Sequence, residues 1–556
     1  MTKAPKDNPN IARALTDMAE SIPDEVAIRY PKHRAPDGTW HYEETTYAEL
    51  DEASTEIAAG LHDIGVEPGT RAVLMVEPSM EFFALTFGLF KAAVVPVMVD
   101  PGMGLGNLKT CLAEAEPTAF IGVSKAHIAR VVLRWASSTI EHKITVGRRW
   151  LWGGFKLSQI RERGSSAGEF RAPGVDADQM AAILFTSGST GVPKGAVYTH
   201  GNFSAQVDII KNTYDIEPGE IDLPTFPLFA LFDPALGMTT VLPEMDFANP
   251  ATVEPRNLVE PIEQFGVTNM FGSPAVMERL GNYGSDRSIE LPSLNRVISA
   301  GAPVPSNTLQ DVEDLLSDGA GVHTPYGATE SLPVASIASG EILGETADAT
   351  DRGAGVCIGR PVDAIDVEII DIRDEPIATW SDDLIVDDGD IGEFVVRGPQ
   401  VTRRYYNRPE ATKEAKIDDG DGVRHRMGDV GYFDDRGRMW FCGRKSHRVV
   451  LDDGTTMFTI RCEAVFNTHP KVYRTALVGP VSGGETVPVL CVELLDEHRG
   501  AVRDELREQL RAIADDFEHT RDIEEFLFHD SFPVDVRHNS KIFREELTTW
   551  AKKNLR

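Results

Sequence analysis

The feature that most constrains the fold is a repeated change of hydrophobic period along the chain. Short apolar runs at residues 71–76, 94–99 and 119–124 alternate with helix-like stretches, and the alternation returns at residues 267–272 and 296–301. Strand, helix, strand in this order predicts βαβ units and a mostly parallel, buried sheet. We therefore expect an α/β protein.

Length and composition indicate a folded chain of several units. At about 150 residues per domain, the 556 residues suggest three to four domain-sized units. Hydrophobic residues at 42% and aromatic residues at 8% exclude a disordered chain. Residues 360–443 become β-rich with turn signals, and an α+β pattern follows Arg444. We expect a large body over residues 1–443, with βαβ parallel sheets and a small β-rich subdomain, and then a small mobile α+β domain over residues 444–556.

Charge and cysteine usage exclude several classes of protein. Asp and Glu number 87 against 55 Lys and Arg, and a chain with a net charge of −32 repels nucleic acids unless it carries a local basic patch. The five cysteines contain no CxxC pair, which fits reduced thiols and supplies no zinc template. The N-terminus lacks the apolar region of a signal peptide, and Lys91 and Pro96 interrupt the longest apolar stretch. We expect a cytoplasmic protein with no nucleic-acid partner and no transmembrane segment.

The segment with the clearest chemistry follows an apolar strand that ends at Phe185. It is rich in glycine, serine and threonine, so its backbone can approach a polyphosphate while amides and hydroxyls donate to phosphate oxygens. It is not a Walker loop, because Pro193 precedes the lysine and Gly195 follows it. The residues predicted to bind phosphate are Thr186, Ser187, Gly188, Ser189, Thr190, Gly191 and Lys194.

This segment, TSGSTGVPKG, resembles the phosphate loop of the adenylate-forming enzymes, which include acyl-CoA synthetases, luciferases and nonribosomal adenylation domains. Other motifs of that superfamily occur in the right order: SAGAPV at 299–304, YGATE at 326–330, MGD at 427–429, GRK at 443–445 and PVDVRHNSKIFRE at 533–545. The matches extend over nearly the whole chain, which makes the resemblance specific.

The resemblance implies that ATP is bound, with a role for each motif. Tyr326, beside Gly327, would flank adenine, and Thr329 would contact the α-phosphate. Asp429 would accept hydrogen bonds from the ribose hydroxyls. The turn on the adenine side would consist of Gly301, Ala302 and Pro303.

The same resemblance implies the catalytic groups. A carboxylate that attacks the α-phosphorus of ATP brings two anions together, so cations must neutralise the developing charge. Glu330 would hold Mg²⁺, Arg444 would lie at the domain junction, and Lys541 would reach the acyl phosphate. Taken singly, Glu330 and Asp429 would be predicted to be solvated loop acids, and Lys541 an ordinary surface lysine. Together with Thr329 and Lys194, we predict that Glu330 and Lys541 are catalytic.

Three departures from a thioester-forming ligase argue against the use of coenzyme A. The string FPLFALFDPALGMT at 226–239 resembles the superfamily's PLFH segment, but Ala230 stands where His is usual. The hinge position holds Ser446 in place of Asp or Lys. Residues 449–463, VVLDDGTTMFTIRCE, replace the GGENIYPAEIE string that helps to form the pantetheine path in thiolating relatives. We therefore expect ATP and Mg²⁺ as cofactors and no coenzyme A.

The string at 226–239, with VDPGMGLGN, TPYGATESLPVA and GAGVCIGRPV, is similar to those of the β-lactone synthetases of bacterial olefin biosynthesis. This resemblance implies that a long-chain 2-alkyl-3-hydroxy acid is adenylated and that its own 3-hydroxyl then attacks, giving a β-lactone, AMP and diphosphate. An intramolecular nucleophile in attack geometry has an effective molarity on the order of 10⁵ M or more. Asp233 and His323 are candidate bases for the hydroxyl proton. A turn-capping role explains Asp233 equally well, and a loop-fixing role is the simpler explanation of His323.

Several alternatives stay open. The chain could be a long-chain fatty acyl-CoA or acyl-AMP ligase, or a nonenzymatic scaffold or nucleotide sensor, although intact catalytic motifs argue against the last. Residues 143–164 concentrate basic and aromatic side chains, a pattern found in docking to a membrane surface or a partner. Tryptophans that pack into the protein's own groove are the simpler explanation. Assembly with neighbouring enzymes of olefin synthesis and peripheral membrane contact both stay open.

Overall fold

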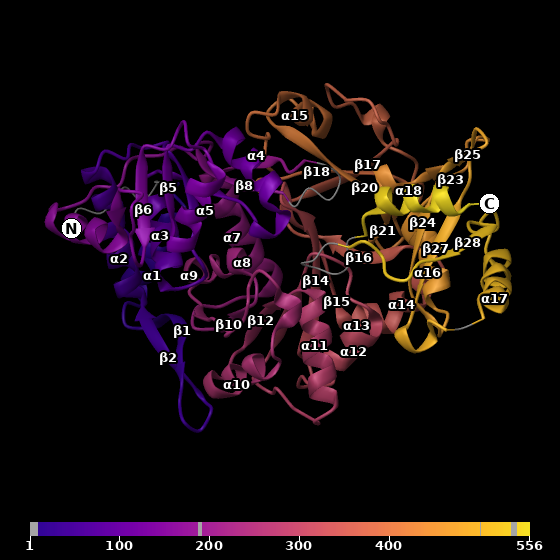
Figure 1. The fold of residues 1–556 in the computed structure, drawn as a ribbon, viewed down its shortest axis with the longest axis horizontal. Helices are drawn as coiled ribbons and strands as arrows, with labels where there is room; N and C mark the ends of the chain where they lie inside the picture. Colours follow the sequence, from indigo (N-terminus) through magenta and orange to yellow (C-terminus); the bar gives the residue numbers. More distant parts are fainter. Residues whose placement is uncertain (1–8, 187–191, 501, 535–541, 556) are drawn as a thin grey trace.

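The computed structural model describes residues 9–186, 192–500, 502–534 and 542–555 (Figure 1). Two large sheets with helices on their faces form the body, and a small α+β part follows at the right of Figure 1. The two ends of the chain lie at opposite ends of the molecule. Within the described ranges, no helix combines the length and apolarity needed to cross a membrane.

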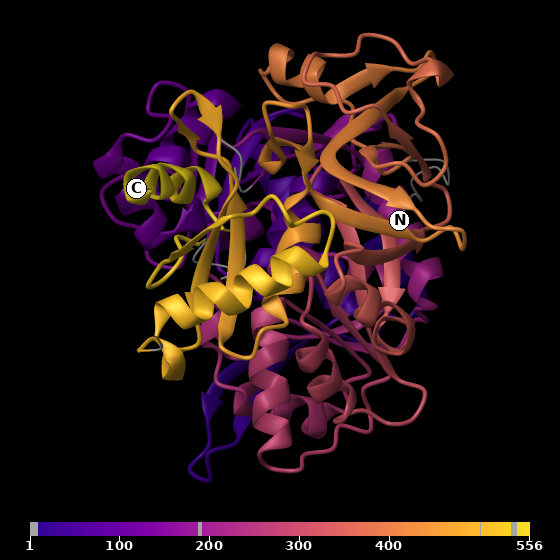
Figure 2. The same cartoon turned by 90° about the vertical axis from the view of Figure 1, so that its right-hand side faces the viewer.

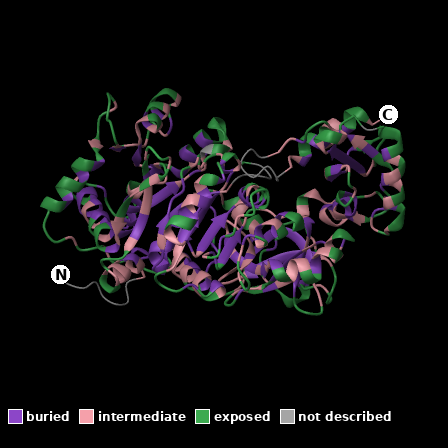
Figure 3. Ribbon diagram, turned by 90° about the horizontal axis from the view of Figure 1, so that it is seen from below, coloured by how far each residue is buried: buried purple, intermediate pink, exposed green. Residues whose placement is uncertain are grey.

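The seven-stranded sheet is parallel except at one edge, and this confirms the α/β prediction. Its strand order is β7-β6-β5-β3-β4-β8-β9, in which β8 and β9 pair antiparallel and the other neighbours pair parallel. Four of the five β5 residues are buried, as is most of α3, because helices cover the sheet on both sides (Figure 3). The strands are β3 (Arg71–Met75), β4 (Val95–Met98), β5 (Ala119–Val123), β6 (His142–Val146), β7 (Phe155–Lys156), β8 (Met180–Phe185) and β9 (Gly195–Thr199). The helices of this region are α2 (Tyr47–Asp63), α3 (Met80–Lys91), α4 (Leu105–Ala115), α5 (Ser124–Leu133) and α6 (Leu157–Ser166).

The second large sheet is partly parallel and partly antiparallel. Strands β1, β11, β10, β12, β13 and β14 pair parallel, and every pairing from β14 onward through β15, β16, β21, β20, β18 and β17 is antiparallel. The parallel part consists of β1 (Val26–Arg34), β10 (Ile221–Pro224), β11 (Thr239–Val241), β12 (Asn269–Gly272), β13 (Arg296–Ser299) and β14 (Gly321–Ala328), with β2 (Trp40–Thr46) antiparallel at its edge. Its helices are α1 (Ala12–Ser21), α7 (His200–Tyr214), α8 (Pro227–Ala230), α9 (Asp233–Leu236), α10 (Arg256–Phe265), α11 (Pro274–Ser285), α12 (Ser306–Glu313), α13 (Ser339–Glu341) and α14 (Ala347–Asp351).

The β-rich region is joined to this sheet rather than standing beside it. Strand β16 pairs with β15 on one side and with β21 on the other, so the antiparallel region continues the sheet of the body. Its elements are β15 (Ser331–Ala338), β16 (Val356–Pro361), β17 (Asp366–Ile370), β18 (Gly392–Arg397), α15 (Pro409–Ala415), β19 (Lys416–Asp418), β20 (Val423–Phe433) and β21 (Met439–Arg444).

The residues after Arg444 have apolar clusters of their own, which contain no described residue before Val449. A three-stranded sheet, β24-β27-β28, carries helices against it (yellow in Figure 2). These clusters support our proposed division into residues 1–443 and 444–556. The elements are β22 (Val449–Val450), β23 (Thr456–Met457), α16 (Thr459–Asn467), β24 (Val472–Val478), β25 (Val481–Ser482), β26 (Glu485–Thr486), β27 (Val489–Leu494), α17 (Arg503–Asp516), β28 (Glu525–Phe528) and α18 (Arg544–Asn554).

The body and the C-terminal part meet at Gly353. Its φ is +84°, and a Cβ atom there would come within 2.2 Å of His519 Nε2, so only glycine fits. Arg461 Nε donates to the Gly353 carbonyl at 2.8 Å, and His519 Nε2 lies 3.2 Å from the Arg461 carbonyl oxygen. A glycine, an arginine and a histidine thus form one direct contact between the two parts.

Candidate active site

The two ends of the predicted phosphate loop are held together by backbone contacts. Thr186 follows β8, and its N–H donates to the Lys194 carbonyl at 3.0 Å. The Lys194 N–H donates to Thr186 Oγ1 at 3.2 Å. The five loop residues between them, Ser187, Gly188, Ser189, Thr190 and Gly191, lie outside the described residues. Two hydrogen bonds between Thr186 and Lys194 therefore close the base of the loop between β8 and β9.

Tyr405 links two of the predicted catalytic residues. Its hydroxyl donates to Glu330 Oε1 at 2.5 Å, and its ring centroid lies 5.3 Å from Lys194 Nζ. Burial, and then the Glu330 charge, raise the pKa of Tyr405 well above its usual value, so the phenol stays a donor. The structure therefore brings Lys194 and Glu330, which are far apart in sequence, to one aromatic side chain.

The backbone beside Glu330 is fixed from two sides. Tyr198 donates its hydroxyl to the Thr329 carbonyl at 2.6 Å. Thr402 donates its N–H and its hydroxyl to the Glu330 carbonyl at 2.9 and 3.1 Å. Lys416 in turn donates to Thr402, and burial lowers the Lys416 pKa to about 7 although the Glu330 charge opposes the shift. The Thr329–Glu330 turn is thus held by hydrogen bonds to both of its carbonyls.

Tyr326, Asp429 and Arg444 form a second group. Asp429 and Arg444 are opposite each other on β20 and β21, and Asp429 Oδ1 lies 3.0 Å from Arg444 Nη1. Tyr326 donates its hydroxyl to Asp429 Oδ2 at 2.6 Å. Burial raises the Asp429 pKa, while the Arg444 charge opposes the shift. Asp429 Oδ1 is buried and, apart from its ion pair with Arg444, meets the geometry of a hydrogen bond with no residue that the structure describes, so it can still accept from a ligand hydroxyl.

The predicted adenine-side turn lies at the same edge of the sheet. β13 and β14 are parallel neighbours, so the Gly301–Pro303 turn after β13 and the YGATE segment at the end of β14 project from the same edge. Gly301 has a φ of +103°, which glycine alone adopts readily. At Gly327 a Cβ atom would lie 2.7 Å from the Ser331 carbonyl oxygen, so a side chain there would collide with backbone. Gly301, Ala302, Pro303 and Gly327 are thus placed beside the Tyr326 group.

Lys541 lies outside the described residues, but both ends of its segment are anchored. Val534 and Ile542 form an isolated antiparallel bridge, and the Phe543 N–H donates to the Pro533 carbonyl at 2.9 Å. Arg544, at the start of α18, forms a buried ion pair with Glu463 at 2.5 Å. The segment that carries Lys541 is therefore fixed to the C-terminal part at its two ends.

The geometry favours a structural role for Asp233. Its carboxyl is buried at the start of α9, accepts from Thr240 Oγ1 at 2.9 Å and hydrogen-bonds to the carboxyl of Asp222. Asn269 donates to the same Asp222. Burial and the neighbouring carboxylate raise the Asp233 pKa, and burial raises that of Asp222 to about 7. A carboxyl that shares a proton with a second buried carboxyl inside the fold is poorly placed to accept the proton of a substrate hydroxyl.

This pair predicts a measurable pH dependence of stability. A folded pKa above the unfolded value means that the folded state binds more protons, so stability falls as the pH rises from about 4 to about 7. Asp233→Asn should flatten this slope, measured as the temperature of the first unfolding transition at pH 5 and pH 8. The exposed Asp318→Asn variant is the control and should keep the wild-type slope. An Asp233→Asn slope equal to the wild-type slope would contradict the pairing.

His323 lies nearer to the predicted chemistry. It stands on β14 three residues before Tyr326, and its ring meets the Tyr214 ring edge-on with centroids 5.5 Å apart. Burial, and then the Arg296 charge, lower the pKa of His323 and so favour its neutral form. Tyr214 belongs to an apolar cluster formed by α7, α8, α9 and the strands β12 and β13. Because it stands on the strand that carries Tyr326, His323 is the better placed of the two candidate bases.

Sequence reasoning missed three residues of the site: Tyr405, Tyr198 and Lys416. Tyr405 lies in a polar loop, RRYYNRPEAT, whose pattern contains no signal for a contact with Glu330. Tyr198 and Lys416 stand on strands as ordinary members of the apolar-polar pattern. Only the pairing of distant segments brings these side chains to the motif residues.

Comparisons with known proteins identify relatives of this chain. A family model described as AMP-binding enzyme matches residues 18–406. The chain is 50% identical over 548 residues to the olefin beta-lactone synthetase of Xanthomonas campestris pv. campestris, covering 98% of this chain and 97% of that protein. It is 49% identical over 553 residues to the olefin beta-lactone synthetase of Stenotrophomonas maltophilia, covering 98% of both. The structure of the amide bond synthetase McbA from Marinactinospora thermotolerans has a TM-score of 0.77 at 23% identity, covering 98% of this chain and 99% of that one, which shows the shared fold.

Proposed function

Because the chain belongs to the AMP-binding enzymes and, within them, to the olefin β-lactone synthetases, we propose that it converts a long-chain 2-alkyl-3-hydroxy acid to a β-lactone. Its kinship establishes an ATP-dependent, AMP-forming synthetase. The proposal rests on the 50% sequence identity to the olefin beta-lactone synthetase of Xanthomonas campestris pv. campestris, which extends over 98% of this chain. The substrate, the site residues and the independence from coenzyme A are the proposed parts.

The proposed reaction has two steps. A carboxylate oxygen of the acid bonds to the α-phosphorus of ATP, and the bond to diphosphate breaks. The 3-hydroxyl oxygen then bonds to the acyl carbon, the bond to AMP breaks, and the hydroxyl proton is lost to a base or to water. AMP is a better leaving group than the oxygen of the free carboxylate, and this allows the strained ring to close. No external thiol takes part.

The residues of the site fit the nucleotide and the metal. Asp429 Oδ1, which apart from its ion pair with Arg444 forms no hydrogen bond with the described part of the chain, suits a ribose hydroxyl, and Arg444 supplies a neighbouring positive charge. Glu330 uses Oε1 for Tyr405, which leaves Oε2 for Mg²⁺, an ion that prefers carboxylate oxygens. Mg²⁺, when bound, would neutralise charge on the phosphates. Lys194 and Lys541 would supply further positive charge toward the transferring group.

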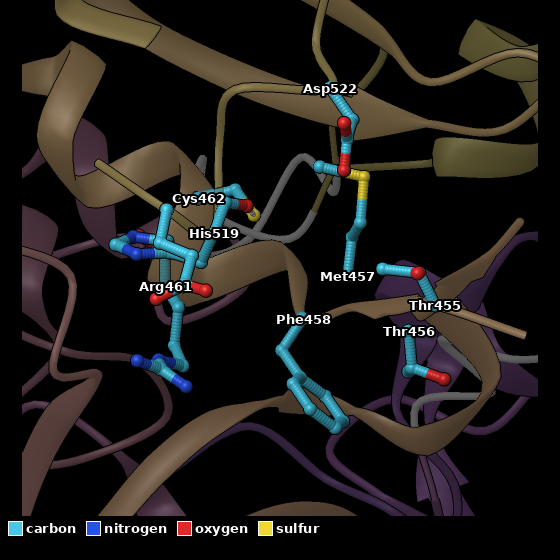
Figure 4. Close-up of a pocket in the computed structure, with 9 residues that line it drawn as sticks. Thr455, Thr456, Met457, Phe458, Arg461, Cys462, His519 and Asp522 are labelled. Atoms are coloured by element: carbon cyan, nitrogen blue, oxygen red, sulfur yellow. Dashed lines mark hydrogen bonds between the residues drawn. The ribbon is translucent and has the colours of Figure 1, made fainter. Parts of the chain in front are cut away.

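We propose that coenzyme A is not a substrate. The segment that replaces the usual GGENIYPAEIE string shares few of its side chains, and its residues Asp452 and Asp453 are exposed. The next residues line a cavity of about 100 Å³ with Arg461, Cys462 and His519 (Figure 4). Figure 4 shows Met457 and Phe458 of this segment among the residues that line the cavity. Arg461 of the same segment connects it to the body by donating to the Gly353 carbonyl. This arrangement differs in its side chains from the string that helps to form the pantetheine path in thiolating relatives.

Tyr405→Phe tests the link between Glu330 and Lys194. Loss of a hydrogen bond to a charged group costs about 1.5–3 kcal/mol, so kcat/KM for AMP formation should fall about 10–150-fold. The dependence of rate on Mg²⁺ concentration should shift to higher concentration, which a merely structural defect would not cause. Tyr406→Phe is the neighbouring control. A wild-type Mg²⁺ dependence in Tyr405→Phe would contradict the positioning role.

The overall proposal is tested by product analysis. The protein is incubated with ATP, Mg²⁺ and a 2-alkyl-3-hydroxy acid, with and without coenzyme A, and the product is identified by NMR before heating. We expect the β-lactone, AMP and diphosphate in equal amounts, unchanged by coenzyme A. A coenzyme A thioester would instead identify an acyl-CoA ligase, a stable acyl-AMP would identify an acyl-AMP ligase, and no AMP from any acid would identify a scaffold or sensor.

We further propose that the reaction takes place in the cytoplasm. The five cysteines are all free and buried, which is typical of a reducing compartment. The alkyl chains of the proposed substrate and product dissolve poorly in water, so transfer to and from neighbouring enzymes of olefin synthesis would be favourable. Co-sedimentation of the purified enzymes would test such an assembly.

A further inference from the structure

Five strongly exposed apolar side chains gather on α5 and on the loop between β6 and β7. Ile128, Val131 and Val132 of α5 expose 46%, 53% and 71% of their surface, and Trp150 and Leu151 of the loop expose 63% and 102%. These are five of the twelve large apolar side chains with such exposure among the described residues, within one short stretch of the chain. An apolar patch on a protein surface commonly marks an interaction site.

The helix and the loop form one continuous surface. Ser124 Oγ, at the start of α5, donates to the Arg148 carbonyl at 2.5 Å. Trp152 stacks on His127 with ring centroids 5.2 Å and ring planes 4° apart. A helix places residue i+4 beside residue i. Ile128 and Val131 therefore lie one turn beyond Ser124 and His127, on the side of α5 that contacts the loop. Trp152 is thus a packing residue, whereas Trp150 and Leu151, in the same loop that contacts α5, are exposed.

The surroundings of this patch are basic although the chain is acidic. Between residues 124 and 156 the one acidic residue is Glu141, whereas the whole chain has 87 acidic residues against 55 basic ones. The basic residues of this stretch are Lys125, Arg130, Arg134, Lys143, Arg148, Arg149 and Lys156. Lys125 pairs with Glu77, but Arg134 and Arg148 form no ion pair within the described part of the chain. Positive charge therefore remains uncompensated beside the apolar side chains.

We propose that this docking surface, made of α5 and residues 147–152, attaches the protein to an anionic lipid bilayer. Tryptophan and leucine at the tip of a loop enter the headgroup region, while adjacent arginines keep their charged ends at the lipid phosphates. Leu151 and Val132 protrude rather than line a hollow, which suits insertion into a fluid layer. The acidic remainder of the chain is repelled by the same lipids, so the basic surface would select one orientation.

Figure 1 shows α5 and β6 in the part of the molecule away from the C-terminal domain. Attachment here would leave that domain free to move against the body. The proposal does not depend on the identity of the substrate, because it rests on the surface alone.

Vesicle sedimentation tests the proposal with the intact protein. Vesicles of phosphatidylglycerol and phosphatidylcholine in equal amounts should pellet the wild type at low salt, and vesicles of phosphatidylcholine alone should not. W150S/L151S should lose binding, because the inserted side chains are removed. R148Q/R149Q should lower the partition coefficient on the order of 25-fold, at about five-fold per basic residue. Salt should weaken binding of the wild type.

R161Q/R163Q is the matched control, because it changes the net charge equally on the neighbouring helix α6. Those arginines already pair with Glu56 and Asp63, so binding should match that of the wild type. All variants should keep the wild-type unfolding temperature. Pelleting with neither vesicle, equal pelleting with both, or full binding by W150S/L151S would overturn the proposal. If the wild type self-associates and does not pellet with vesicles, and W150S/L151S abolishes the self-association, the surface binds a second copy of the chain and the proposal is overturned.

Discussion

Glu330→Gln is expected to lower the rate of AMP formation by about 10³-fold or more. Glutamine keeps the shape of the side chain and can still accept from Tyr405, but it removes the negative charge that would hold Mg²⁺. Loss of charge stabilisation by a metal costs several kcal/mol in the transition state, and each 1.36 kcal/mol is a factor of about ten. The measurement is acid-dependent exchange of labelled diphosphate into ATP, which reports the first step alone.

The exposed Glu290→Gln variant is the control for that experiment and should keep the wild-type exchange rate. Thermal unfolding of Glu330→Gln should match the wild type, since the backbone contacts of the turn do not involve the carboxylate. Exchange within ten-fold of the wild-type rate would show that Glu330 does not hold the metal.

Lys541→Ala is expected to abolish adenylation while the protein stays folded. Removing a cation that neutralises charge on the transferring group costs about 10²–10³-fold or more. The segment of Lys541 is anchored on both sides, by the Val534–Ile542 bridge and the Arg544–Glu463 ion pair, so the substitution leaves those contacts in place. The measurement is AMP release, and Lys552→Ala on the exposed side of α18 is the control. AMP formation at the wild-type rate in Lys541→Ala would refute the assignment of this loop.

The parallel sheets were predictable from the sequence because their signal is local. Each buried strand, such as β5, is a short apolar run, and the helices between the strands have a different period. The pairing of β16 with β21 was not predictable, because it joins segments separated by several other strands. Such pairings form only when the sheet assembles, so the hydrophobic pattern within each strand does not indicate them.

The candidate site divides in the same way. Motifs predict Glu330, Asp429 and Arg444 as functional positions, since their types and order resemble a known pattern, and the structure places Tyr326 beside Asp429 and Arg444. Tyr405 was missed because its role depends on a contact with Glu330 across the site. Trp150 and Trp152 could not be told apart by sequence, because only the stacking partner His127 decides which of them is packed.

The central claim is that the carboxylate is activated and that the substrate's own hydroxyl closes the ring. It is tested most directly with a 2-alkyl-3-hydroxy acid whose two carboxylate oxygens are both ¹⁸O. The account predicts one ¹⁸O in AMP and one in the lactone carbonyl, with an unlabelled ring oxygen. A lactone that retains both labels, with unlabelled AMP, would mean that the hydroxyl is activated and displaced instead, and would contradict the account.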